Sequence, residues 1–436
     1  MLVRGDAPAE NLLVTGARVL DPAAGVDARI DVRIDDGVIA QLGTSLDRNG
    51  HRVVDGTGLV LAPAFVDPHV HLRVPGREDE ETIASGTAAA AAGGYCAIVA
   101  MPNTDPVVDS AAVLGALVED ARREAAIPVG FLAAITKGQA GAELTEMAEL
   151  ADAGALGFSD DGRPVVASGL MRRALQYGAV TGRKLALHCE EPTLTRGAHM
   201  HEGVVSAELG FGGYPSVGES VMVERDLALA AYEERPLHLL HLSARESVAA
   251  LRAARERGVE ATAEVTPHHL CLTDEAVRSL DSNVKMNPPL RSREDRAALI
   301  DALRDGTIGA VATDHAPHAR HEKEVPFEEA PFGVTGLETA FAALYTHLVE
   351  PGVLPLETIL ERMSAGAART FGLDEPRIAV GARANLVLLD LDATWRVRED
   401  GFRSRSTNSW LLGDTLRGKV RATIADGTTV FSELRA

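Results

Sequence analysis

The sequence predicts an α/β protein of two parts, a closed (β/α)8 barrel of the TIM type and a small β-sandwich formed by both ends of the chain. Two observations lead to this prediction. The middle of the chain repeats a short apolar run, a polar residue at the end of the run and a segment of helical periodicity. The two ends instead alternate apolar and polar residues, which is typical of strands with one buried face.

Eight apolar runs in the middle of the chain have the length of buried strands. Continuous apolar runs separated by helical segments, such as residues 110–125, indicate parallel strands joined by crossover helices. Eight such units suit a closed barrel. An open doubly wound sheet is the alternative, but no GxGxxG loop follows any run. The runs are 59–67, 95–103, 127–135, 155–161, 184–190, 237–243, 259–269 and 308–315.

Both ends of the chain contain an Asp-Gly pair, at residues 36–37 and 426–427. Such pairs between alternating segments favour β-hairpins. We therefore expect residues 1–61 and 377–436 to form one β-sandwich beside a barrel of residues 62–376.

Charge and composition narrow the class of protein. The formal net charge of -20 argues against nucleic acid or an anionic membrane as a partner, since both select basic surfaces. A small anionic substrate is compatible with this charge, because metals and arginines set the field inside a cleft. The N-terminal segment lacks the apolar core of a signal peptide, and the three cysteines form no CxxC pair. We expect a cytoplasmic protein without a disulfide framework.

Five predicted strand ends carry residues that bind divalent metals, and active sites of TIM barrels lie at these ends. Histidines and carboxylates in this number are the ligands of a transition-metal site. The period of two along a strand places His69 and His71 on the same side. An HxH pair alone is weak evidence, so the prediction rests on the joint occurrence. The residues are His69, His71, Asp160, Asp161, His188, His241 and Asp314.

Other histidines are harder to place. His238 precedes His241 by three residues, so we expect it to point away from the metal and to pack outside the barrel. His268 and His269 follow the seventh run and could support the ligands.

Two segments resemble the signatures of dihydroorotases, members of the amidohydrolase superfamily: DPHVHLRVP at 67–75 and ATDHAPHARHEK at 312–323. AEVTPHH at 263–269, KMNPPLRS at 285–292 and PFGVTGLET at 331–339 extend the resemblance over nearly the whole chain. The chain is most similar to the bacterial long-form, type I members. The resemblance implies a barrel of the amidohydrolase type.

The resemblance also implies two zinc ions per chain. The implied ligands are His69, His71 and Asp314 for one ion and His188 and His241 for the other. Hydantoinases bridge the ions with a carboxylated lysine near the end of strand four, but none of the five lysines lies there. Long-form dihydroorotases use an aspartate, which would be Asp161. Asp160 is the alternative, although it should point to the opposite face, and either could instead cap the turn before Gly162.

A substrate carboxylate calls for a guanidinium and amide donors. Arg73 lies two residues beyond His71 on the same side of the strand and is the best anchor. The resemblance adds Asn103 and His318 to this clamp and assigns Asn287 to the substrate ring. Phe332 and Gly333 would offer backbone donors from a mobile lid. Without the resemblance, the two asparagines could close their own turns, and the segment could be an exposed charged loop. The implied substrate-binding residues are His71, Arg73, Asn103, Asn287, His318, Phe332 and Gly333.

The implied function is that of a dihydroorotase, the reversible cyclisation of N-carbamoyl-L-aspartate to L-dihydroorotate in de novo pyrimidine biosynthesis. A hydroxide bound by two zinc ions would attack the ring, with Asp314 as general acid and base. The resemblance further implies a homodimer and, for some members, aspartate transcarbamoylase as a partner.

Two alternatives are weighed against this function. A hydantoinase, dihydropyrimidinase or allantoinase would act on rings that mostly lack a carboxylate, so it would not need Arg73 and Asn103 in a clamp. A non-catalytic homologue that serves as a scaffold for aspartate transcarbamoylase commonly loses HxH ligands or the final aspartate. Here all of them are present.

Overall fold

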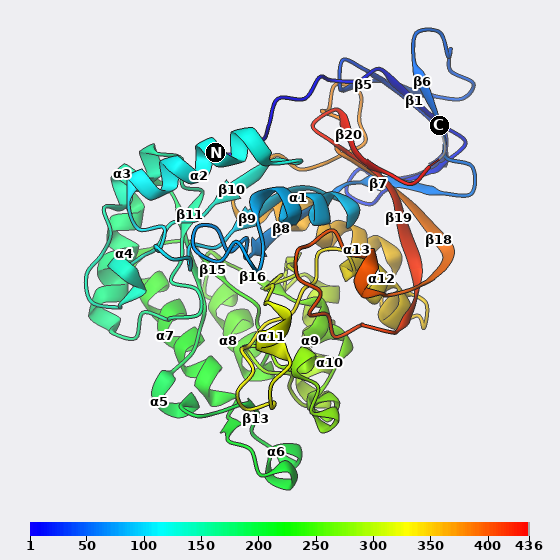
Figure 1. Ribbon diagram of the computed structural model, residues 1–436. Helices are drawn as coiled ribbons and strands as arrows, with labels where there is room; N and C mark the ends of the chain where they lie inside the picture. The colour runs from blue at the N-terminus through cyan, green and yellow to red at the C-terminus, as the bar shows by residue number, and fades with distance from the viewer. Residues whose placement is uncertain (435–436) are drawn as a thin grey trace.

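The structure, a computed structural model, describes residues 1–434 and has the two parts that the sequence predicts (Figure 1). Short parallel strands surrounded by helices form a barrel, and the strands of both chain ends lie beside it. Within the described residues no helix is long and apolar enough to cross a membrane.

The barrel consists of eight short strands, each overlapping one predicted run. Three pair in the order β10-β9-β8 and five in the order β11-β12-β15-β16-β17. Two parallel bridges, Ala133 with Phe158 and Val70 with His315, join the two sheets and close the barrel. The strands are β8 (Phe65–Val70), β9 (Tyr95–Ala100), β10 (Val129–Phe131), β11 (Gly157–Phe158), β12 (Lys184–Leu187), β15 (Leu237–Leu239), β16 (Ala261–Val265) and β17 (Ala310–Val311).

Amphipathic helices follow these strands. In α2, for example, Leu114, Leu117, Val118 and Ala121 are buried at the spacing of one helix face, and Ser110 caps the first turn. The longer helices are α1 (Ile83–Ala92), α2 (Ala111–Glu124), α3 (Met147–Asp152), α4 (Ser168–Thr181), α7 (Val217–Glu233), α8 (Arg245–Glu256), α10 (Arg293–Asp305), α13 (Leu356–Met363) and α14 (Ala365–Thr370).

Short elements fill the connections. They are the helices α5 (Pro192–Thr195), α6 (Val204–Leu209), α9 (Pro267–Cys271), α11 (Arg320–Lys323) and α12 (Ala340–Leu344), the strands β13 (Met200–His201) and β14 (Gly213–Tyr214), the 3-10 turns Lys137–Gln139, Asp274–Ser279, Ser282–Val284 and Glu399–Gly401, and the π-helical turn Tyr345–Val349.

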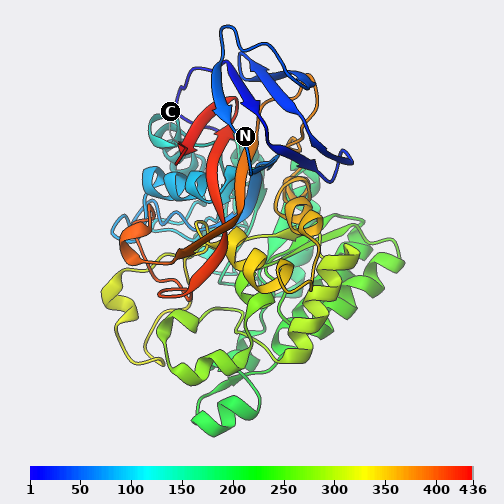
Figure 2. The same cartoon turned by 90° about the vertical axis from the view of Figure 1, so that its right-hand side faces the viewer.

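The chain ends form two sheets, with the orders β5-β4-β1-β6 and β20-β19-β18-β7-β2-β3. Buried side chains between them, among them Leu12, Ile34, Leu61 and Leu386, form a separate core. Figure 2 shows β18 and β19 running from this sandwich along the barrel. The strands are β1 (Leu12–Thr15), β2 (Arg18–Asp21), β3 (Val26–Arg29), β4 (Asp31–Asp35), β5 (Val38–Gly43), β6 (Arg52–Asp55), β7 (Val60–Pro63), β18 (Leu386–Arg396), β19 (Thr415–Ala425) and β20 (Thr428–Ser432).

The predicted boundary at residue 61 falls inside β7, which pairs with β18 and β2 of the sandwich. The first predicted run, 59–67, therefore contains the end of one part and the start of the other. We propose that the sandwich extends to Pro63 and the barrel begins at Ala64. At the other boundary, Ile378 is buried in the sandwich core, which supports a second segment that begins near residue 377.

Candidate metal centre and substrate pocket

The predicted ligands meet at the carboxyl ends of the barrel strands, where four of them form a first cluster. Asp314 Oδ1 lies 3.3 Å from His69 Nε2 and 3.0 Å from His71 Nε2. Asp161 Oδ2 lies 3.7 Å and 3.5 Å from the same two nitrogens. All four residues are buried. They come from β8, from the segment after β11 and from the segment after β17.

A second cluster faces the other oxygen of Asp161. Its Oδ1 lies 3.7 Å from His188 Nδ1 and 3.5 Å from His241 Nε2. The two nitrogens are 3.0 Å apart. Asp161 therefore presents one carboxylate oxygen to each cluster, as a bridging ligand does.

The spacing of these atoms fits metal ions. Ligand atoms about 2.1 Å from a tetrahedral ion lie about 3.4 Å from one another, close to the observed separations. His69 Nε2 and Asp161 Oδ1 are buried and have no hydrogen-bond partner. Such orphaned atoms are costly unless an ion or another group satisfies them. The clusters are therefore able to hold divalent metal ions.

The opposite ring nitrogen of three ligand histidines donates to a fixed acceptor, which leaves the cluster nitrogen free to bind a metal. His69 Nδ1 donates to Glu264 Oε1 at 2.7 Å, and His71 Nδ1 donates to Asn103 Oδ1 at 2.9 Å. His188 Nε2 donates to Glu190 Oε2 at 2.9 Å. Sequence reasoning missed both glutamates.

His238 lies inside the barrel, so the expectation that it packs outside was wrong. Its Nε2 is 2.9 Å from Glu264 Oε2, and its side chain is fully buried. The expectation assumed that strand alternation continues to His241. The strand ends at Leu239, and His241 has φ of 28°, so the chain turns and both rings reach the interior.

The two adjacent aspartates have different surroundings. Asp160 accepts hydrogen bonds from the backbone amides of Ile135 and Thr136, at 2.8 and 3.1 Å, and from the Thr136 hydroxyl. It thereby fixes the segment that follows β10. Asp161 faces the histidines instead, on the side that the sequence favoured.

Three functional candidates adopt backbone conformations with positive φ that side chains other than glycine rarely adopt. The φ angles are 60° at Arg73, 28° at His241 and 48° at Asp314. Such conformations cost about 1–3 kcal/mol each and collect at functional sites. The surrounding barrel must therefore hold these side chains in place.

A cavity of about 360 Å³ opens beside the clusters. It contains every predicted substrate-binding residue except His318, which contacts Arg73 and Phe332 at its edge. Asn103 lines the cavity, but its amide is engaged: Oδ1 accepts from His71, and Nδ2 lies 3.3 Å from Asp161 Oδ2. The lining includes His71, Arg73, Asn103, Asp161, His188, His241, Asn287, Asp314, Phe332 and Gly333.

Arg73 is the cation of this cavity. Its Nε donates to Pro317 O at 3.0 Å and lies 3.1 Å from Glu80 Oε2. Its Nη2 is 3.4 Å from His318 Nε2. Burial lowers the pKa of Arg73 below its usual value, and the nearby carboxylates offset only part of this shift. Acceptors beside the cavity thus hold one edge of the Arg73 guanidinium, and the side chain lines the cavity.

The loop of residues 319–333 contains most of the segment expected to be a mobile lid, residues 321–336, and two buried lysines fasten it. Lys285 Nζ donates to Phe327 O and Glu328 O, at 2.7 and 2.9 Å. Lys323 Nζ donates to Ser282 O and Pro331 O, at 2.9 and 2.8 Å. Burial lowers the pKa of Lys323 to about 7. These bonds hold the loop that carries Phe332 and Gly333 against the segment that carries Asn287.

Comparisons with known proteins show the family to which this chain belongs. The model of the family described as "Dihydro-orotase-like" matches residues 58–247. The dihydroorotase of Geobacter metallireducens is 43% identical over 97% of this chain and 99% of the relative. That of Pelotomaculum thermopropionicum is 45% identical over the same shares. The chain belongs to the dihydroorotase family.

Solved structures of other cyclic amide hydrolases share the fold of this dihydroorotase family member. The L-hydantoinase of Arthrobacter aurescens, at 25% identity, superposes with a TM-score of 0.88 over 98% of this chain and 97% of that one. The dihydropyrimidinase of Brevibacillus agri gives 0.83 over 97% and 95%, at 23% identity. The predicted barrel with a β-sandwich is therefore confirmed.

We predict that Lys323→Met loosens the loop of this dihydroorotase family member. Ser282 O and Pro331 O would lose their donor, and each unsatisfied buried group costs about 1–3 kcal/mol. A glutamate-specific protease should then cleave within 319–333 faster than in the wild type. Lys419→Met is the matched control, because Lys419 pairs with Glu433 near the surface. Equal resistance of Lys323→Met and the wild type would contradict the anchoring role.

Proposed function

We propose that this chain is a dihydroorotase, which interconverts N-carbamoyl-L-aspartate and L-dihydroorotate in de novo pyrimidine biosynthesis. One observation carries the proposal: the half-buried guanidinium of Arg73 lines the same cavity as two ligand clusters that Asp161 faces with its two oxygens. The clusters suit the hydrolysis of an amide, and the guanidinium suits a ring that bears a carboxylate. The curated relatives named dihydroorotase support this reading.

The clusters would hold two zinc ions, one at His69, His71 and Asp314 and one at His188 and His241, with Asp161 shared. Bound divalent ions of this kind polarise an amide carbonyl and lower the pKa of water. Histidine and aspartate ligands also accept manganese, cobalt or iron. Zinc is proposed because imidazole and carboxylate at this spacing suit a tetrahedral ion.

The chain's own groups would bind and orient the substrate. Arg73, with His318 beside it, would bind the ring carboxylate. Asn287 Oδ1 is buried and has no hydrogen-bond partner, so it is available to a ring N–H. Phe332 and Gly333, held by the anchored loop, would supply backbone groups. Asn103 would join the clamp once its amide is released from Asp161.

Asp314 would move the proton of the reaction. In hydrolysis it accepts a proton from the attacking water and delivers it to the ring nitrogen as the C–N bond breaks. Ring closure runs through the same steps in reverse, so Asp314 must then begin protonated. Closure converts a dianion and one proton into a monoanion and water. Low pH therefore favours closure, and high pH favours hydrolysis.

Asp314→Asn should reduce turnover in both directions by about 10²–10⁴-fold, because the amide keeps the shape of the side chain and cannot take up the proton. The rates are measured with dihydroorotate and with N-carbamoyl-aspartate, and metal content is measured on the same samples. In the wild type, the closure rate should rise relative to hydrolysis as the pH falls. Asp55→Asn on the surface is the control. Wild-type turnover in Asp314→Asn would remove this residue from the mechanism.

Metal binding should saturate at two ions per chain and weaken as the pH falls. Burial lowers the pKa of His69, but Asp314 and Asp161 raise it, and the net shift is well upward. An ion must displace this proton, so protons compete with metal below the raised pKa. Elemental analysis after chelation and reloading with zinc tests the number. His188→Ala should hold fewer ions, whereas His51→Ala should keep both. Full loading of His188→Ala would contradict the second cluster.

The substrate is tested with a panel of dihydroorotate, dihydrouracil, hydantoin and allantoin. Arg73→Gln should lower kcat/KM for dihydroorotate roughly 30-fold or more, since loss of a buried charged contact costs about 2–5 kcal/mol. The same change should leave kcat/KM for the carboxylate-free rings nearly unchanged. Thermal unfolding of the variant checks that the fold is intact. A wild-type preference for a carboxylate-free ring would favour a hydantoinase, dihydropyrimidinase or allantoinase instead.

A non-catalytic scaffold is the less favoured alternative, because every implied ligand is present and converges.

We also propose a homodimer. Exposed apolar side chains on neighbouring helices α4 and α7, Val180 and Tyr232, support a contact surface there. Association with aspartate transcarbamoylase and a cytoplasmic location stay predictions.

A further inference from the structure

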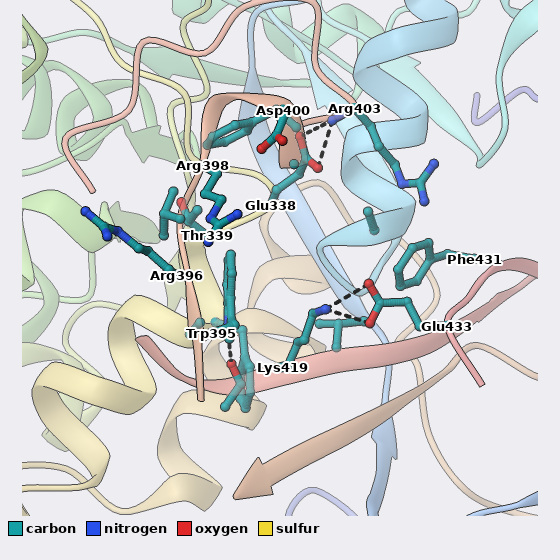
Figure 3. Close-up of a pocket in the computed structure, with 18 residues that line it drawn as sticks. Glu338, Thr339, Trp395, Arg396, Arg398, Asp400, Arg403, Lys419, Phe431 and Glu433 are labelled. Atoms are coloured by element: carbon teal, nitrogen blue, oxygen red, sulfur yellow. Dashed lines mark hydrogen bonds and ion pairs between the residues drawn. The ribbon is translucent and has the colours of Figure 1, made fainter. Parts of the chain in front are cut away.

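A second cavity lies away from the metal clusters, between α12, the loop that follows β18 and the strands β19 and β20. Its volume is about 270 Å³. Figure 3 shows Trp395 and Arg398 facing it from one side and Phe431 from the other. We call it the hairpin cavity, because residues of the β18–β19 hairpin supply most of its wall. None of the groups proposed for catalysis lines it.

The hairpin cavity is rich in unpaired cations. Arg396, Arg398 and Arg403 line it, and none of the three forms an ion pair with a carboxylate of residues 1–434. The lysine of the cavity, Lys419, is already paired with Glu433 at 2.7 Å.

Glu338, a half-buried carboxylate of the hairpin cavity, accepts hydrogen bonds from backbone groups and forms no ion pair with these arginines. Glu338 accepts backbone N–H groups of Arg403 and Ser404, at 2.9 to 3.0 Å. Burial raises the pKa of Glu338 to about 7, so the group is partly neutral near physiological pH. Its bonds serve to hold the backbone of residues 403–404 at the edge of the cavity.

Aromatic rings complete the lining. Trp395 Nε1 donates to Gly418 O at 3.0 Å, which fixes the indole plane. The guanidinium of Arg403 lies 5.1 Å from the centre of the Phe431 ring. A fixed indole beside the unpaired guanidinium of Arg398 presents a stacking surface and an anion site to the same small ligand.

We propose that the hairpin cavity binds a small planar aromatic anion, with its ring against Trp395 and its negative group on Arg398, which lies on the same side of the cavity (Figure 3). A neutral ring would lack the ionic contact, and a small anion without a ring would lack the stacking contact. The cavity thus selects for both features together.

The hairpin cavity is linked by hydrogen bonds to the substrate pocket. Residues 404 and 405 donate to Glu81, whose Oε2 lies 3.1 Å from His315 Nε2. Farther along the same segment, Asn408 Nδ2 donates to Gly333 O at 3.2 Å. Arg398 belongs to the same connection between β18 and β19, so a ligand that holds Arg398 in place also restrains the segment that holds Gly333. We expect occupancy to change the KM for dihydroorotate at least twofold, an effect that rests on the proposed function.

Binding is tested without reference to catalysis, with benzoate as the probe. The chain has two tryptophans, so Trp410→Phe leaves Trp395 as the fluorescent reporter. Benzoate should change this fluorescence saturably, whereas benzamide and acetate should need at least tenfold higher concentrations. The double variant Arg398→Gln, Arg403→Gln should bind benzoate with at least tenfold lower affinity. Arg29→Gln, an exposed arginine on β3, should leave it unchanged.

Two results would overturn the assignment. One is the absence of a saturable response, or a response equal in the double variant. The other is loss of the response in Arg73→Gln, which would mean that benzoate binds in the substrate pocket. The KM for dihydroorotate is then measured with saturating benzoate in the wild type and the double variant. A wild-type KM that does not respond would refute the link between the pockets and leave the binding result standing.

Discussion

Two buried carboxylates, Asp161 and Asp314, face four imidazole rings, and the whole site depends on how their charge is balanced. An unpaired buried charge costs several kcal/mol. Protons on the imidazoles can supply the positive charge, which is why the pKa of His69 is raised. Metal ions supply the same charge and also satisfy His69 Nε2, which otherwise has no partner. Because the ligands come from five strand ends, ion binding would also tie together distant parts of the barrel, and metal and fold stability should be coupled.

Polar side chains inside the barrel hold the ligand residues in place by hydrogen bonds. Glu264 accepts from His69 and His238 and from the backbone of His241, so one carboxylate connects three strands. Asp67 accepts from the amide of Thr313 at 3.1 Å and from the Thr313 hydroxyl. These bonds reinforce the contact between β8 and β17, where the strand ladder supplies little because β17 has two residues. The short strands therefore rely on side-chain bonds to keep the ligands in register.

The sequence was sufficient for the eight strands and for the convergence of the ligands, because each ligand follows an apolar run and TIM barrels gather such ends on one face. It was insufficient where position depends on the end of a strand. His238 was misplaced because alternation stops at Leu239. Glu264 lies in a run of buried residues, and its role depends on which rings lie across the barrel. Likewise, the anchoring of the 319–333 loop depends on Lys285 and Lys323, and only the folded chain brings them to its carbonyl groups.

In the proposed metal centre, an aspartate as the bridge imposes a geometric requirement that a carboxylated lysine would not. A lysine reaches the ions through a long, flexible arm, whereas an aspartate must be brought close by its backbone. Asp160 meets this requirement by bonding to Ile135 and Thr136, which pins the turn directly before Asp161. The two adjacent carboxylates thus have different roles: Asp160 fixes the backbone, and Asp161 faces both clusters. In the proposed centre the bridging charge would be present without a reaction with carbon dioxide, and Asp160–Asp161 would stand in place of the carboxylated lysine that is expected of hydantoinases.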